Sequence, residues 1–211
     1  MTTASFDGHI AGVGTQEGTR IVVGRWLVSP LGAFADVMVE RADGTRLLLA
    51  PREDVAELVA ATYLFDAVHV VPVQLGTDEE HRLWRLRAGP LTADLTIGPR
   101  TSVGHLLALV PRHPALARAA ATAVDPVARS VLDGVRTRGT AGQGRREWYT
   151  ASDQHAVTAV SASWGSTDLG VLAPVAPRVR FGFSSVPEAP TVTRVRTTIA
   201  LDRGPASPEF R

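Results

Sequence analysis

Short β-type runs separated by turn signals constrain the fold of this chain more than any other feature. The clearest case is Asp43-Gly44, which lies between two apolar runs and predicts a tight hairpin. Roughly ten such runs predict a mainly antiparallel sheet. We expect strands over residues 21–28, 33–41, 45–50, 66–75, 81–88, 91–97, 146–150, 155–163, 178–184 and 192–201.

Two clusters of helical pattern interrupt the strands. The first runs from Pro51 to about Thr62, and the second runs from Ser102 to Gly134 with proline breaks. Because helices and strands do not alternate regularly, the pattern favours an α+β fold over a doubly wound sheet. We predict a curled, mainly antiparallel sheet or partial barrel with helices packed on one face.

No linker-like stretch divides the chain, so we expect residues 1–201 to form a single α+β domain. A split near residues 134–144 is the alternative. Residues 1 to about 8 have the composition of a loose segment. Residues 202–211 hold Gly204, Pro205 and Pro208 with little apolar content, which predicts a disordered C-terminal tail.

Three absent residue types exclude several chemistries. The chain of 211 residues has no Cys, no Lys and no Asn, and all 22 of its basic residues are Arg. A Schiff base and a P-loop lysine are therefore excluded, as are a thiol nucleophile, a thiolate metal site and a disulfide. No histidine pair has the helical spacing of a zinc site, so we expect neither a metal nor a cofactor.

Charge and hydropathy bear on the expected partners and cellular location of the protein. The formal net charge of +1 argues against a dedicated nucleic-acid partner. No apolar run approaches the ~20 residues needed to span a membrane, and the first residues lack a signal-peptide pattern. We therefore expect a cytoplasmic protein with no membrane partner; the oligomeric state is left open.

The most unusual stretch is an arginine- and glycine-rich segment over residues 134–149 that runs into an aromatic pair. Arginine presents a planar fork of donors that matches phosphate or carboxylate, and glycine lets a backbone approach a ligand closely. The alternative is a solvated connection with no specific partner. The candidate ligand-binding residues are Arg136, Arg138, Arg145, Arg146, Trp148 and Tyr149.

Candidate catalytic residues lie just beyond this segment. Glu147, Asp153 and His155 combine two carboxyl groups with an imidazole, which is the inventory for general acid–base chemistry. Residues two apart on a strand share a face and residues three apart do not, so closeness in sequence alone is weak evidence that these groups form one site.

One strand carries an unusual face. Asp36 and Glu40 alternate with the small apolar residues of segment 33–40. If the apolar face is the packed one, both carboxyl groups face water. If the sheet curls and this strand faces inward, they line a cavity, and burial raises their pKa values.

Three stretches resemble a family of uncharacterised proteins from GC-rich actinobacteria. They are Trp26–Gly32, Arg145–Tyr149 and Arg180–Phe183. The resemblance implies a bacterial cytosolic setting and nothing about mechanism.

Three functions follow as hypotheses. The leading one is a binder of a small, anionic and partly apolar molecule, with the arginines as the anion contact and Trp148 and Tyr149 as the apolar wall. Arg138→Ala and Arg145→Ala should then weaken anion binding. The second is an enzyme that uses carboxylate and histidine groups on a small carbonyl or carboxylate substrate. The third is a protein-interaction module.

Overall fold

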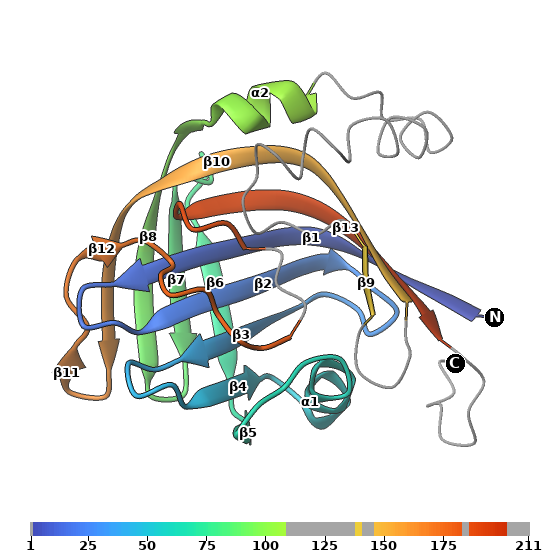
Figure 1. Cartoon of the computed structure of the whole chain (residues 1–211), viewed down its shortest axis with the longest axis horizontal. Coiled ribbons are helices and arrows are strands. Elements are labelled where there is room, and N and C mark those ends of the chain that lie inside the picture. Colours follow the sequence, from blue (N-terminus) through green and yellow to red (C-terminus); the bar gives the residue numbers. More distant parts are fainter. Residues whose placement is uncertain (1, 109–137, 141–145, 183–185, 202–211) are drawn as a thin grey trace.

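In the computed structural model, most of the described residues belong to one sheet that curls into a half-barrel (Figure 1). The structure describes residues 2–108, 138–140, 146–182 and 186–201.

The long strands fall into two halves along the chain. The first half contains β1 (Thr2–Thr15), β2 (Arg20–Val28), β3 (Phe34–Glu40), β4 (Arg46–Ala50) and β5 (Ala67–Val70). The second half contains β6 (Val73–Thr77), β7 (Leu83–Ala88), β8 (Leu91–Arg100), β10 (Arg146–Trp164) and β13 (Thr191–Leu201). The short strands β9 (Arg138–Thr140) and β11 (Thr167–Asp168) pair with β10, and β12 (Leu172–Ala173) pairs with β1.

The strands follow one another across the sheet in the order β5-β4-β3-β2-β1-β13-β10-β8-β7-β6. The paired strands are antiparallel except β4 and β5, which run parallel. The first long strand of the chain pairs with the last, so β1 and β13 lie side by side at the centre of the sheet. The predicted curled and mainly antiparallel sheet is therefore confirmed.

The prediction of a loose N-terminus is wrong, because residues 2–15 form the central strand β1. Glycines at positions 8, 12 and 14 hide this strand from a propensity argument. They are needed for close packing, since a Cβ on Gly12 would lie 1.9 Å from Val186 and one on Gly14 would lie 2.0 Å from the carbonyl oxygen of Pro174.

Other strand boundaries also differ from the sequence prediction. Segment 66–75 holds parts of two strands, β5 and β6, which are separated at Val71-Pro72. The two strands expected over 146–150 and 155–163 are one strand, β10, with register shifts around residues 151–159. Residues 178–182 are not a strand, and the rest of that predicted strand, 183–184, lies outside the described residues.

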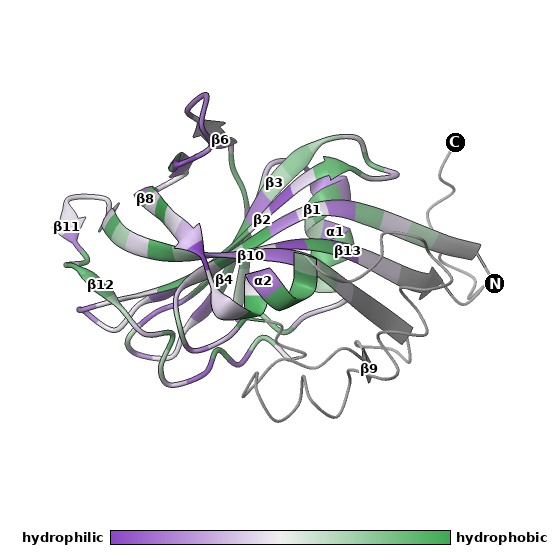
Figure 2. Cartoon of the chain, turned by 90° about the horizontal axis from the view of Figure 1, so that it is seen from above, coloured by the Kyte–Doolittle hydropathy of each residue, from purple (hydrophilic) through white to green (hydrophobic). Residues whose placement is uncertain are grey.

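Two helices are described. Helix α1 (Glu53–Ala60) begins after Arg52, so Pro51 is not its first residue, and it packs against β4 and β5. Helix α2 (Ser102–Ala108) lies against β10 and β8 (Figure 2). The rest of the helical pattern falls in 109–137, outside the described residues, as does the tail 202–211. The single domain and the packing of helices on one face stay predictions.

Both faces of β2, β3 and β4 are largely buried, whereas the edge strand β5 is mostly exposed. Hydropathy alternates along the strands (Figure 2), and the concave face packs Val23, Val37 and Leu49 against Leu86 and Leu95 of the second half. The outer face of β1–β4 is covered by α1 and by the described parts, 174–182 and 186–190, of a covering segment over 174–190, and both covering elements bury apolar side chains there. No helix among the described residues is long and apolar enough to cross a membrane.

Candidate functional site

One end of the concave face carries a compact group of charged and aromatic side chains. His9 of β1 lies directly between Arg25 of β2 and Arg194 of β13 in the strand register. Trp84 of β7 reaches the same place from the other half of the sheet, with its ring 6.1 Å from the His9 ring and 5.7 Å from the Arg25 guanidinium carbon. We call these four residues the concave-face cluster.

His9 is half-buried at the centre of the concave-face cluster. Its Nδ1 is buried and has no hydrogen-bond partner in the described part of the chain. Burial, together with the positive charges of Arg25 and Arg194, lowers the pKa of His9 to about 4, so the ring is neutral at pH 7.

Four arginines lie along this end of the sheet, and they differ in their partners. Arg196 donates from Nε to Asp7 at 3.0 Å. Arg100 binds Asp153 through two hydrogen bonds of 2.8 and 2.9 Å. The remaining two, Arg25 and Arg194, form no ion pair with any carboxylate of the described residues. Within the part of the chain that the structure describes, this end of the sheet therefore has two arginines without a carboxylate partner.

The structure brings two of the predicted catalytic residues together. The nearest oxygen of Asp153 lies 3.6 Å from Nε2 of His155, and His155 Nδ1 lies 3.2 Å from the carbonyl oxygen of Gly98. Burial works to raise the pKa of Asp153, but hydrogen bonds from Arg100 and from the backbone of Gln154 outweigh it and lower that pKa. Asp153 is therefore an arginine-bound carboxylate at neutral pH and a poor proton acceptor.

The predicted arginine-rich segment is only partly described. Arg136 and Arg145 lie outside the described residues. The backbones of Arg138 in β9 and of residues 146–149 in β10 are described, while their side chains are not. In the register, 146–149 lie beside residues 197–200 of β13, so this backbone runs on from the end of the sheet that holds Arg194. Trp148, Tyr149, Arg146 and the third catalytic candidate, Glu147, belong to this stretch.

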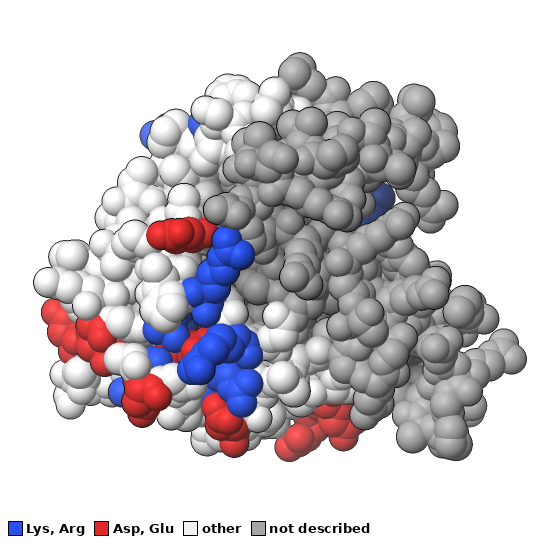
Figure 3. All heavy atoms as spheres, viewed as in Figure 1, with Lys and Arg blue, Asp and Glu red and all other residues white. Residues whose placement is uncertain are grey.

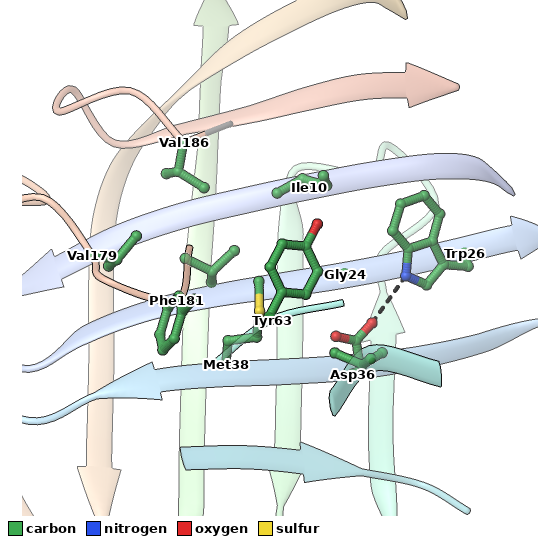
Figure 4. A pocket seen from close by; sticks show the side chains of 11 residues that line it. Ile10, Gly24, Trp26, Asp36, Met38, Tyr63, Val179, Phe181 and Val186 are labelled. Carbon is green, nitrogen blue, oxygen red and sulfur yellow. Dashed lines mark hydrogen bonds between the residues drawn. The ribbon is translucent and has the colours of Figure 1, made fainter. Parts of the chain in front are cut away.

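A second feature is a cavity of about 60 Å³ on the outer face of the sheet (Figure 4). It lies between β1–β3, the end of α1 and the covering segment 174–190. Its polar groups are the carboxyl group of Asp36, the indole of Trp26 and the phenol of Tyr63, and apolar side chains form the rest of its wall. Trp26 Nε1 donates to Asp36 Oδ1 at 2.9 Å.

The expectation that Asp36 and Glu40 face water is wrong, because they are 4% and 0% exposed. Both carboxyl groups lie on the outer face of the sheet, where the covering segment buries them; the inward curl of the sheet is not sufficient to explain their burial. Only Asp36 lines the cavity. Glu40 is held by Arg20 at 2.9 Å and by Arg180 at 2.7 Å.

Arginines and carboxylates alternate on the described part of the surface above this region (Figure 3). Arg46, for example, pairs with Asp66 at 2.8 Å beside the Arg180–Glu40 pair. This surface is therefore mixed in sign.

Sequence reasoning missed all four residues of the concave-face cluster, since they come from four different strands that only the fold of the sheet brings together. Among the described residues, no group of three His, Asp or Glu side chains is placed to hold a metal ion. A comparison of the chain with known family models and with curated proteins finds no match.

Proposed function

We propose that the protein binds a small, anionic and partly apolar molecule at the concave-face cluster. The anionic group lies between Arg25 and Arg194, and the apolar part packs against Trp84. One observation carries this proposal: the two guanidinium groups flank His9 and have no carboxylate partner within the described residues.

The physical chemistry of the cluster supports an anion over other ligands. Guanidinium groups bind oxyanions through two parallel hydrogen bonds, and the attraction is stronger where the surroundings are partly apolar. His9 is neutral at pH 7 and adds no positive charge of its own, so the two guanidinium groups provide the charge that attracts the anion. The Trp84 ring, which is 2% exposed, provides an apolar wall behind the two arginines.

The arginine-rich segment is part of the same proposal. The backbone of 146–149 continues along the strand next to Arg194, so these residues are near enough to extend the site. The expected loss of anion binding in Arg138→Ala and Arg145→Ala stays a prediction. The cytoplasmic setting expected from the sequence also belongs to this proposal.

Calorimetric titration with benzenesulfonate tests the proposal, because this probe combines an aromatic ring with a permanently anionic group. We expect Arg194→Gln and Arg25→Gln each to weaken its binding by about tenfold, which corresponds to the loss of one charged hydrogen-bonding group.

Matched controls separate charge recognition from general effects. Arg85 is exposed on β7, next to Trp84 in the chain and on the opposite face, so Arg85→Gln should leave affinity unchanged. Benzenesulfonamide has nearly the same shape without the charge and should bind far more weakly. Equal affinity for the two compounds, or equal loss in all three variants, would contradict the proposal.

Acid–base catalysis is the alternative that one observation favours. Asp153 and His155 lie on the face of the sheet that holds Arg194, within reach of a molecule bound there. His155→Gln should then abolish turnover of a bound carbonyl or carboxylate substrate without changing its affinity. For the interaction-module hypothesis, the matching surface is the edge strand β5, where Val68 and Val70 are exposed.

A further inference from the structure

The cavity on the outer face contains a carboxyl group that lacks a counter-charge. Among the described residues, Asp36 and Tyr63 are the only titratable ones that line the cavity, and they extend into it from β3 and from the turn after α1 (Figure 4). No charged group of the described residues contributes to the pKa of Asp36. Burial alone raises that pKa from 3.8 to about 7, against the hydrogen bonds from Trp26 and its own backbone.

Glu40 lies four residues after Asp36 on the same face of β3 and shows which partners a buried carboxylate needs in this fold. Arg20 and Arg180 contact it from two sides, and the backbone N–H of Arg180 donates to its second oxygen at 2.7 Å. Asp36 receives one side-chain hydrogen bond and no cation. An unpaired buried carboxylate is costly, so a positive group that enters the cavity is strongly favoured there.

The backbone beneath Asp36 leaves space for this arrangement. Gly24 lies opposite Asp36 in the register of β2 and β3. A Cβ on Gly24 would lie 2.4 Å from Asp36 Oδ1 and 2.7 Å from Trp26 Nε1. The absence of a side chain at this position keeps the indole and the carboxyl group in contact at the wall of the cavity.

We propose that this cavity is a second binding site, which takes the ammonium group of a small alkylamine against the Asp36 carboxylate. The short carbon chain of the amine packs against Met38, Val179 and Phe181. This site is on the opposite face of the sheet from the concave-face cluster, takes a ligand of opposite charge, and does not rest on the function proposed above.

The size of the cavity limits the ligand. The cavity has a volume of about 60 Å³. A single water needs about 10–15 Å³, so there is room for roughly four water-sized groups. Ethylammonium, with three heavy atoms, fits this space, whereas a benzene-sized group needs a cavity of about 150 Å³.

The indole N–H of Trp26 provides a direct reporter in a proton–nitrogen NMR spectrum. The chain has four Trp residues, and Trp26→Phe identifies its signal by loss. We expect this signal to move with pH with a midpoint near 7, as Asp36 ionises. Ethylammonium at about nine times its dissociation constant should lower the midpoint by about one pH unit, because only the carboxylate form binds it.

Matched probes and variants decide the outcome. Ethanol and acetate, of similar size but neutral and anionic, should not lower the midpoint. Asp36→Asn should lose both the titration and the ethylammonium response. Val179→Ile retains the carboxyl group and adds one methyl group to the wall, so it should weaken ethylammonium binding while the other indole signals stay in place. An unchanged midpoint with ethylammonium, an equal shift with ethanol, or a response that persists in Asp36→Asn would overturn the proposal.

Discussion

At the scale of single residues, the contrast between Asp36 and Glu40 shows how partners decide the cost of a buried carboxyl group. Both groups are almost fully buried on one face of β3. Two arginines compensate Glu40, whereas a single indole contacts Asp36. The folded protein therefore holds the Asp36 proton to a higher pH than an unfolded chain does.

This difference makes the stability of the fold depend on pH. The pKa of Asp36 is 3.8 in an unfolded chain and about 7 in the fold, so between these values the folded state binds a proton that the unfolded state has lost. The resulting stabilisation is present below about pH 4 and is lost as the pH rises through 7. The full change is on the order of 4 kcal/mol.

We expect Asp36→Asn, which cannot ionise, to match the wild type near pH 4 and to exceed its free energy of unfolding above pH 7. Urea unfolding of both proteins across this range measures the difference directly. The difference between the two proteins is the quantity to follow, because the pKa values of Asp54, Asp66 and Asp153 are lowered and affect both proteins equally. A difference that stays constant with pH would contradict the burial of an uncompensated Asp36.

At the scale of strands, glycines decide where backbones and side chains come close. The glycines of β1 have low β-propensity, so the sequence did not predict this strand. The same glycines allow close packing, because a Cβ on Gly8 would lie 2.1 Å from the carbonyl oxygen of Arg25. The opposite error occurred at Val179 and Phe181, whose alternation is typical of a strand. Both are buried in an irregular segment that covers the sheet. Alternation of apolar and polar residues indicates that one side of a segment is buried, but it does not show that the segment is hydrogen-bonded to a neighbouring strand.

Two strand glycines offer a matched test. Gly24→Ala should destabilise the fold by about 1–3 kcal/mol, because its Cβ would enter the space between Trp26 and Asp36. Gly76 of β6 has nothing within 4 Å of the same position, so Gly76→Ala should be neutral or stabilise by about 0.5–1 kcal/mol. Thermal unfolding of the two variants measures both effects, and similar losses in both would mean that the close approach at Gly24 has no energetic weight.

At the scale of the whole molecule, the curl of the sheet creates the proposed anion site. Arg25 and Arg194 are far apart in the sequence, and they meet because β1 pairs with both β2 and β13. The sequence supported a curled antiparallel sheet and the hairpin at Asp43-Gly44. It did not contain the register that places two arginines beside His9, since pairing of first and last strands has no local signal.

The candidate site residues were likewise only partly predictable, because contacts from distant segments decide their surroundings. The alternation of Asp36 and Glu40 with apolar residues allowed either burial or exposure, and only the covering segment 174–190 decides between them. Asp153 lay between the two predicted strands, so its spacing from His155 was weak evidence that the two side chains come together; the continuous strand β10 is what places them on one face. The bidentate contact from Arg100, which makes Asp153 a poor base, comes from a neighbouring strand and was not predictable from that spacing.

The most direct test of the anion site is the pKa of His9, measured by NMR with and without saturating benzenesulfonate. Burial and the charges of Arg25 and Arg194 lower this pKa to about 4 in the free protein. A sulfonate between the two arginines offsets their charges and remains anionic throughout the titration. We predict that the pKa of His9 rises by about one unit or more on binding. If benzenesulfonate binds and the pKa of His9 stays near 4, the anion does not lie at the concave-face cluster.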